Sequence, residues 1–188
     1  MSREFIRGGR SVTLLTSGTI RDELLVAVTS TLSLPSEPTG RGDALLVVLG
    51  ALDLAAGMSV DDAQAIEDVL AGVAGEIRTF VSDDGTLRAD QAVVFVIDDE
   101  ASLGTTARVA DAVVAESAIS FARALSIELR RAGTHVSVVM TAVIERAEID
   151  QVDAVVAARI ASTLDEGIET SGREDFVGRP AQLGRLRP

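Results

Sequence analysis

The sequence predicts an α/β fold in which helices cover both faces of a mostly parallel sheet. Apolar runs at residues 43–50 and 93–97 are continuous rather than alternating, which is typical of strands buried on both faces. Longer segments with helical periodicity, above all residues 60–81 and 106–131, alternate with such runs along the chain. Strands separated by a helix pair in parallel, with right-handed crossovers as the default. We therefore expect a three-layer sandwich with about four or five strands.

The N-terminal part predicts one strand and one helix. Residues 1–10 are polar and are expected to form a loose arm before a strand at residues 11–16. Thr19 is a possible N-cap for a helix over residues 20–32. Residues 34–42 contain two prolines and two glycines, so they are expected to form a connector into the first buried strand.

The two long helices carry end signals. Ser59 is placed to cap the helix over residues 60–81. Gly133 ends the helical pattern over residues 106–131, because glycine readily adopts the left-handed conformation that terminates helices. Residues 136–140 then form another apolar run, which completes a strand, helix, strand unit in the middle of the chain.

The C-terminal part adds an amphipathic helix at residues 151–164 and a short strand near residues 175–177. We divide the chain into an N-terminal arm (residues 1–10), one α/β domain (residues 11–165) and a C-terminal tail (residues 166–188). A single domain suits a chain of 188 residues.

Composition and charge exclude several classes of function. The formal charge of −12 disfavours binding to the phosphate backbone of nucleic acids. No apolar run approaches the roughly 20 residues that a membrane span needs. No secretory signal is visible and cysteine is absent, so we expect a cytoplasmic protein that does not bind membranes. The chain also lacks Lys, Asn, Tyr and Trp, which excludes chemistry by a lysine amine, a phenol or a thiol.

The strongest pattern is at the end of the second long helix. Residues 121–129 read FARALSIEL, and residues 133–139 read GTHVSVV. This part resembles the short-chain dehydrogenase/reductase family, in which a helix ending in a pattern like A-R-A-L-A-x-E-L precedes a glycine turn and an apolar strand. Residues 44–51 sit where that family has an Asn-Asn-Ala-Gly strand end. The resemblance covers residues 11–165 and implies a Rossmann-like fold and NAD(P)-dependent oxidoreductase chemistry.

The resemblance places the catalytic positions of the family on side chains of the wrong kind. Counting back from Glu128, the tyrosine position falls on Asp111 and the lysine position on Ala115. The serine position falls on Asp98 or Asp99. The family reaction needs a phenol that passes a proton and an ammonium group that lowers the pKa of that phenol. We therefore expect a pseudoenzyme without catalytic residues.

The cofactor site implied by the resemblance is also reduced. The turn Ser17-Gly18-Thr19 has one glycine where the family has several, so we interpret it as vestigial and expect no cofactor. In a full member, two further strands separate the first helix from the next strand, whereas here only residues 34–42 do so. The remaining sheet would have the order 1-4-5-6, without the adenine-side strands. Its first strand, residues 11–16, would be an edge that an arm, a loop or another chain must cover.

Two polar features have both a functional and a structural interpretation. Asp98, Asp99 and Glu100 close a strand at the end where α/β proteins bind ligands. With Asp111 nearby they suit a carboxylate site for Mg²⁺ or for acid–base chemistry, but a solvated loop or helix-capping charge explains them more simply, and no metal site is expected. His135 begins a strand at the opposite end and is expected to be structural.

The helix over residues 106–131 is apolar on nearly all sides, and a sheet can cover only one of them. In the resembled family this helix and the preceding one pack against a partner subunit. We therefore expect a protein partner, an active paralogue or a second copy, at helices 60–81 and 106–131. The expected interface residues are Val109, Val113, Glu116, Ser120, Arg123 and Ile127. Covering by neighbouring helices and the C-terminal tail is the alternative.

These features predict a catalytically inactive subunit of a heteromeric NAD(P)-dependent dehydrogenase or reductase, which pairs with an active member of the resembled family. Two alternatives remain open. One is an enzyme of altered chemistry that uses Asp98, Asp99 and Asp111, and the other is a homodimeric ligand-binding protein.

Overall fold

The computed structural model describes residues 2–20, 22–33, 42–52, 59–98, 109–141, 149–166 and 168–177. Six strands form its main sheet, in the spatial order β1 (Ser2–Arg7), β2 (Arg10–Ser17), β3 (Ala44–Leu49), β6 (Ala92–Asp98), β7 (His135–Thr141) and β8 (Glu174–Val177). The pairs from β2 to β8 are parallel, and β1 pairs antiparallel with β2. A separate hairpin joins β4 (Ser82–Asp83) to β5 (Thr86–Leu87).

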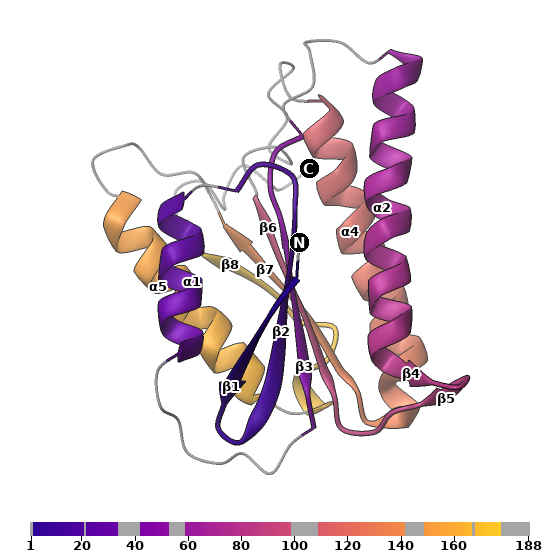
Figure 1. Cartoon of the computed structure of the whole chain (residues 1–188), viewed down its shortest axis with the longest axis vertical. Coiled ribbons are helices and arrows are strands. Elements are labelled where there is room, and N and C mark those ends of the chain that lie inside the picture. Colours follow the sequence, from indigo (N-terminus) through magenta and orange to yellow (C-terminus); the bar gives the residue numbers. More distant parts are fainter. Residues whose placement is uncertain are drawn as a thin grey trace.

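Helices cover both faces of this sheet (Figure 1). One face carries α1 (Asp22–Ser33) and α5 (Ile149–Asp165), and the other carries α2 (Val60–Val81) and α4 (Val109–Glu128). Short 3-10 helices, η1 (Leu129–Ala132) and η3 (Ile168–Thr170), come after α4 and α5. The predicted three-layer sandwich and the predicted order of its parallel strands are confirmed. None of the described helices combines the length and the apolarity needed to cross a membrane.

The apolar side chains of the continuous strands belong to two hydrophobic cores, one on each face of the sheet. In β3 every side chain is buried, and its residues alternate between the two faces. Leu45, Val47 and Leu49 pack under α2 and α4. Leu46 and Val48 pack under α1 and α5. A strand covered on both sides needs an apolar residue at every position, which is why this run is continuous.

The expectation of a loose arm at residues 1–10 is wrong, because Ser2–Arg7 forms β1. A two-residue turn, Gly8-Gly9, joins β1 to β2, with Arg7 opposite Arg10 in the register. Both glycines have positive φ, +57° and +77°, as the tightest hairpin turns require. The predicted need to cover the edge of β2 is therefore met by the N-terminal residues themselves.

Two arginines tie this hairpin to the ends of both helices on its face. The Arg10 guanidinium is buried and donates to the Leu164 carbonyl at 2.8 Å, at the end of α5. Arg7 donates to the Thr31 carbonyl at 3.2 Å, at the end of α1, and also pairs with Asp165. Cations are favourable there because the last turn of a helix carries unpaired carbonyls and the negative end of its dipole.

Arg10→Met keeps much of the aliphatic volume and is expected to lower the free energy of unfolding by about 2 kcal/mol, since a buried carbonyl loses a charged donor. Urea unfolding measures this loss. Arg3→Ala, on the exposed part of β1, is the control and should change stability by less than about 0.5 kcal/mol. Equal losses in the two variants would contradict the anchoring role of Arg10.

The crossovers do not share one hand. From β2 onward every crossover steps to the next strand in the same direction across the sheet. The helices of these crossovers nevertheless lie on different faces, α1 and α5 on one and α2 and α4 on the other (Figure 1). The direction of the step and the face covered together set the hand, so two of the four crossovers are left-handed. Right-handed crossovers hold in roughly 98% of known cases, so the default is broken here.

The helix ends agree with the predictions except at Thr19. Ser59 forms a capping box with Asp62 at the start of α2, and Gly133, with φ +76°, ends η1. Helix α1 begins at Asp22, so Thr19 does not immediately precede it. The backbone of Thr19 instead pairs with Ala51. A long-range backbone pair has replaced the local cap.

The capping box predicts a pH effect. The Asp62 carboxylate accepts hydrogen bonds from the backbone and the side chain of Ser59, which lower the pKa of Asp62 below the ordinary value of an aspartate. A lowered folded-state pKa adds stability that is complete above the ordinary carboxyl pKa and is lost as pH falls through the folded-state value. The stability difference between the wild type and Asp62→Ala should therefore be constant from neutral pH to mild acid and shrink below that range. Urea titrations at a series of pH values would measure it, and a difference that grows in acid would contradict it.

Candidate functional site

The first candidate site lies at the carboxyl ends of the parallel strands. There the turn after β2 is hydrogen-bonded to the segment after β3. The Thr19 amide donates to the Ala51 carbonyl at 2.7 Å, and the Ala51 amide donates back at 3.0 Å. The Gly50 amide donates to the Ser17 carbonyl at 2.9 Å. The predicted vestigial turn, Ser17-Gly18-Thr19, is thus joined to the neighbouring strand end.

Two glycines make this approach possible. A Cβ added to Gly18 would lie 2.7 Å from the carbonyl oxygens of Gly50 and Ala51, and its φ of +77° also disfavours side chains. A Cβ added to Gly50 would overlap the Thr19 carbonyl oxygen. The two backbones are therefore in direct contact, and there is no room between them for even a methyl group.

The residues at the predicted catalytic positions have other partners. Asp111 lies in the first turn of α4, and its Oδ1 accepts a hydrogen bond of 2.7 Å from the Leu52 amide. Ala115 is 3% exposed and packs in the core under α4. Asp98 ends β6, but its side chain lies outside the described residues, as do Asp99 and Glu100. The described contact of Asp111 is with the segment after β3, and a carboxylate site shared with Asp98, Asp99 and Glu100 stays a prediction.

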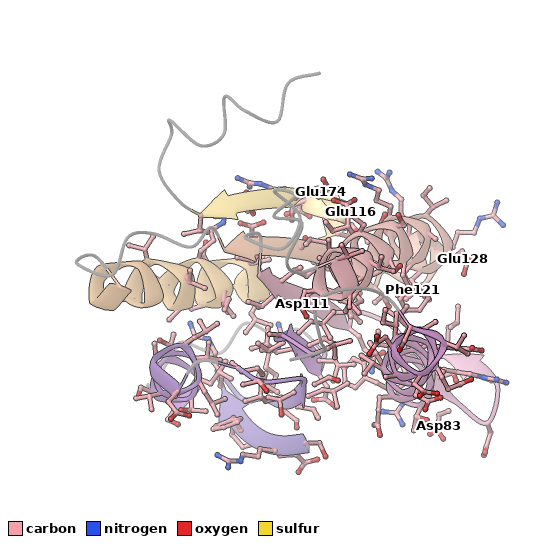
Figure 2. The ribbon with its side chains drawn as sticks, turned by 90° about the horizontal axis from the view of Figure 1, so that it is seen from above. Asp83, Asp111, Glu116, Phe121, Glu128 and Glu174 are labelled. Atoms are coloured by element: carbon pink, nitrogen blue, oxygen red, sulfur yellow. The ribbon has the colours of Figure 1, made fainter. Side chains whose placement is uncertain are left out.

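A groove between α2 and α4 is the second candidate site. Its volume is about 500 Å³. The floor is formed by Phe95 and Leu49 of the sheet, and Phe121 lines the wall from α4 (Figure 2). The rings of Phe95 and Phe121 meet edge to face with centroids 6.4 Å apart. Glu67 of α2 is the one charged residue among those that line the groove in the described part of the chain.

Comparisons place this architecture among known structures. No family model matches the sequence, and no curated protein matches it significantly. A 3-oxoacyl-[acyl-carrier protein] reductase from Brucella melitensis, solved with NAD, superposes with a TM-score of 0.62 at 12% identity, over 96% of this chain and 98% of that chain. A short-chain dehydrogenase/reductase (glucose/ribitol dehydrogenase) from the same organism gives a TM-score of 0.62 at 17% identity, over 93% and 97%. The fold is that of the short-chain dehydrogenases and reductases.

A third similar structure is a short-chain oxidoreductase from Pseudomonas aeruginosa PAO1, described as containing an atypical catalytic centre. It has a TM-score of 0.59 and 16% identity, over 84% of this chain and 72% of that chain. At such identities the likeness shows the fold, and activity has to be argued from the residues of this chain.

The residues at the carboxyl ends of β2 and β3 do not fit a dinucleotide. A pyrophosphate is bound by free backbone amides beside a glycine-rich turn. Here the amides of Thr19, Gly50 and Ala51 donate to backbone carbonyls, and the turn has one glycine. The sequence also contains no lysine, tyrosine or asparagine to hold the ribose or to pass a proton. No step of a hydride-transfer reaction can therefore be assigned to these side chains.

Most of the predicted interface residues lie on the outer surface of α4. Val109 and Ile127 are 42% and 76% exposed, Glu116 and Ser120 are exposed, and Val113 is partly buried. Arg123 forms a two-hydrogen-bond ion pair with Glu174 of β8, which raises the pKa of the guanidinium. Arg123 therefore holds the edge strand, and a role in an interface stays a prediction for all six residues. The apolar residues of α4 are buried mainly against the sheet and α2.

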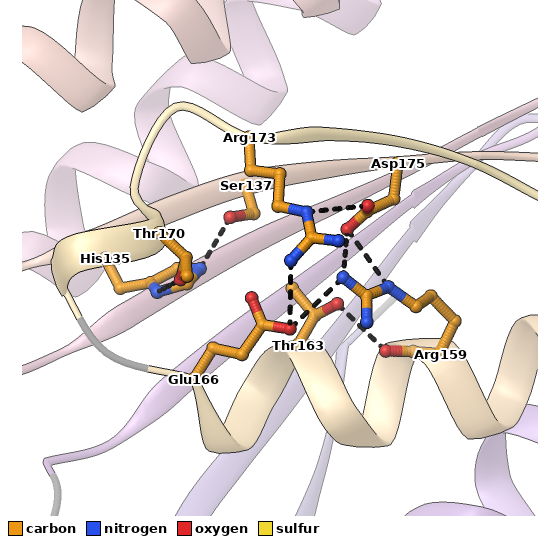
Figure 3. Close-up of polar contacts among 8 residues, drawn as sticks. All are labelled: His135, Ser137, Arg159, Thr163, Glu166, Thr170, Arg173 and Asp175. Atoms are coloured by element: carbon orange, nitrogen blue, oxygen red, sulfur yellow. Dashed lines mark hydrogen bonds and ion pairs between the residues drawn. The ribbon is translucent and has the colours of Figure 1, made fainter.

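His135 lies in a buried polar cluster beside β8 (Figure 3). The imidazole is 2% exposed, and its Nε2 is 2.6 Å from the Ser137 hydroxyl. Its Nδ1 is 3.4 Å from the Thr170 hydroxyl in η3. A histidine sealed in this way cannot reach a substrate, in agreement with the structural interpretation. The described residues contain no group of His, Cys, Asp and Glu suited to a metal ion.

Sequence reasoning missed two features of these sites. The first is the groove, whose lining residues Ala71 and Ala74 are small and give no periodic signal of a cavity. The second is the ion-pair cluster beside His135, in which Arg159 and Arg173 both bind Asp175 (Figure 3). Opposite charges far apart in sequence do not indicate pairing before the fold is known. The hydrogen bonds of Asp175 and the charge of Glu166 raise the pKa of Arg159.

Proposed function

We propose that this chain is a catalytically inactive short-chain dehydrogenase-like protein of the cytoplasm, acting as a non-catalytic subunit of a heteromeric NAD(P)-dependent dehydrogenase or reductase. The observation that carries the proposal is the state of the tyrosine and lysine positions. Asp111 is bound to a backbone amide and Ala115 is buried in the core. Ala115 has no group that could hold or pass a proton, and Asp111 is a carboxylate engaged by the Leu52 amide where the family reaction uses a phenol.

The hydrogen-bonded contact between the turn after β2 and the segment after β3 supports the absence of a cofactor. The amides of Thr19, Gly50 and Ala51, which lie at these strand ends, donate to backbone carbonyls of the chain itself. Opening the site would break these bonds and separate two backbones held in contact at Gly18 and Gly50. Binding of a dinucleotide would have to offset that cost without the side chains that normally supply affinity.

The hand of the crossover through α1 supports the loss of the adenine-side strands. In a doubly wound sheet the chain first steps away from the later strands, and its first helices therefore cover the opposite face. Helix α1 covers that opposite face, yet the chain steps directly to β3. This arrangement is expected if a segment between α1 and β3 has been deleted while α1 kept its place. The antiparallel strand β1 then occupies the vacated edge.

The surface formed by α2 and α4 is the proposed contact with an active paralogue. It presents an apolar groove of about 500 Å³ and the exposed side chains of Val60, Val109 and Ile127. A protein that lacks chemistry can still contribute to an enzyme by stabilising the partner it binds. The predicted alternative that uses Asp111 for catalysis is not favoured, because this carboxylate holds the Leu52 amide.

Two measurements test the proposal. Calorimetric titration with NAD(H) and NADP(H) is expected to show no binding in the micromolar range, and clear saturation would contradict the loss of the cofactor site. Co-expression with an intact short-chain dehydrogenase encoded nearby in the genome is expected to yield a stable complex with a higher melting temperature than the dehydrogenase alone. Independent behaviour of both chains at high concentration would contradict the subunit role.

A further inference from the structure

We propose that the groove between α2 and α4 is a binding site for a small amphipathic cation, an apolar molecule that carries one ammonium group. This inference goes beyond the proposed subunit role and does not depend on it. Two features of the groove select this class of ligand. One is the apolar lining, and the other is the exposed carboxylate of Glu67 within that lining.

The interior of the groove suits an apolar body of small-molecule size. Its volume of about 500 Å³ lies within the range of small-molecule pockets, roughly 300–1,000 Å³. The lining that comes from α2 extends from Ala63 to Ala74, which is about 16 Å along the helix. Most of the described lining residues are apolar, so displacing water from them with an apolar body is favourable.

Small side chains keep this space open. Ala71 and Ala74 of α2 and Ala118 of α4 line the groove, where longer side chains would close it. The ring of Phe121 is only partly buried and lines the same space. Aromatic rings attract one another in edge-to-face or offset contact, so an aromatic body suits this wall.

Two polar side chains of the lining have unused hydrogen-bonding capacity. Glu67 is exposed and forms no ion pair in the described part of the chain. Ser117 of α4 is partly buried, and its hydroxyl has no hydrogen-bond partner among the described residues. A carboxylate only accepts hydrogen bonds and a hydroxyl can accept them, so both groups suit a donor such as an ammonium group.

The charge around the groove favours a cation over an anion. Helix α2 carries five carboxylates and one arginine, and the whole chain has a formal charge of −12. Among the described residues, no basic side chain lines the groove. Ala63 and Ala71, one turn on either side of Glu67, are uncharged, so no neighbouring cation competes for this carboxylate. An anion such as a fatty acid or a nucleotide would be repelled.

A bound cation would change the surface that α2 and α4 present to a partner. It would occupy the apolar groove and neutralise the charge of Glu67. Because the paralogue is proposed to contact the same surface, the cation and the paralogue should compete. That competition, unlike the binding itself, rests on the proposed subunit role.

Calorimetric titration of the full chain with three compounds that share one apolar body tests the inference. Phenylbutylamine is the cationic probe, phenylbutanol the neutral one and phenylbutyrate the anionic one. The wild type is expected to bind one phenylbutylamine with a Kd below about 1 mM. Phenylbutanol should bind at least about threefold more weakly, because it lacks the charge that Glu67 attracts, and phenylbutyrate more weakly again. Added salt should narrow these differences.

Glu67→Gln should bind phenylbutylamine and phenylbutanol about equally, and Glu76→Gln is the matched control. Glu76 is exposed on the same helix, about two and a half turns from Glu67 and hence on the opposite side. Its replacement removes the same charge and should leave the preference for the amine unchanged. Ala74→Leu places a larger side chain in the groove and should weaken the binding of both the amine and the alcohol about tenfold. Circular dichroism checks that each variant keeps its fold.

An amine that binds the wild type no more tightly than the alcohol, or a preference for the amine that Glu67→Gln retains, would overturn the inference. Absence of saturable binding for all three compounds would do the same. A wild type that dimerises in sedimentation velocity, with a dimer that the amine does not dissociate, would mean that protein side chains fill the groove and would also overturn it. Each of these results leaves the subunit role standing, because that role is tested by co-expression and by dinucleotide titration.

Discussion

Phe95→Ala is expected to lower the free energy of unfolding by about 4 kcal/mol, a large part of the stability of an ordinary domain. The ring of Phe95 is fully buried at the centre of β6. Its strand neighbours in the register are Val47 and Val138, and its ring packs edge to face against Phe121. Removing the ring leaves a cavity that adjoins the groove between α2 and α4. Because the groove holds no side chain that could move into this cavity, the surrounding residues can relax only a little.

The measurement is urea unfolding followed by circular dichroism, with the slope of the transition compared between variants. Leu87→Ala is the control, because Leu87 is 46% exposed in the β4–β5 hairpin, and it should cost less than about 0.5 kcal/mol. A loss below about 1.5 kcal/mol for Phe95→Ala would mean that β6 and α4 do not pack as described. Phe121→Ala should cost less than Phe95→Ala, since its ring is only partly buried.

The parallel sheet could be predicted because its strands are determined locally. Residues such as Val93 and Val94 must both be apolar when a strand is covered on two faces, and that demand is visible in the sequence without knowledge of the fold. Helix ends such as Ser59 and Gly133 are likewise set by nearby backbone groups. These features were all predicted with the correct kind of element.

Strand β1 was missed because little of it is buried. Phe5 is partly buried and Ile6 is 73% exposed, so the alternation of an amphipathic strand is weak. The Gly8-Gly9 turn was nevertheless present in the sequence, and a glycine pair before an apolar run is a hairpin signal. Giving that signal more weight than the polar composition would have found the strand.

The candidate site depends on long-range contacts, which sequence patterns do not carry. Asp111 was expected near Asp98 as part of a carboxylate group. The side chain of Asp98 lies outside the described residues, and the described contact of Asp111 is with the amide of Leu52, 59 residues away. The face covered by α1 also cannot be read from its apolar stripe, because the stripe shows that one side is buried and not against which side of the sheet. The absence of lysine, tyrosine and asparagine, by contrast, needed no structure at all.

Gly50→Ala is expected to lower the free energy of unfolding by about 3 kcal/mol, because an added methyl group overlaps the Thr19 carbonyl oxygen and something in the backbone must shift. The damage should be local. Hydrogen exchange should accelerate at the amides of Thr19 and Ala51, which hydrogen-bond the turn after β2 to the segment after β3. The amides of β6 and β7 should keep the protection that global unfolding sets.

Gly75→Ala is the matched control, since a Cβ there meets nothing within 4 Å. In the middle of α2 that substitution should stabilise the protein by about 1 kcal/mol, the difference in helix propensity between glycine and alanine. Stability changes of opposite sign for these two glycine-to-alanine substitutions would show that the backbone contact at Gly50, and not the loss of a glycine, destabilises the protein. Gly50→Ala should also gain no affinity for NAD(H), because opening the edge does not restore the missing side chains. A variant that folds and then binds the dinucleotide would show that closure alone keeps the cofactor out.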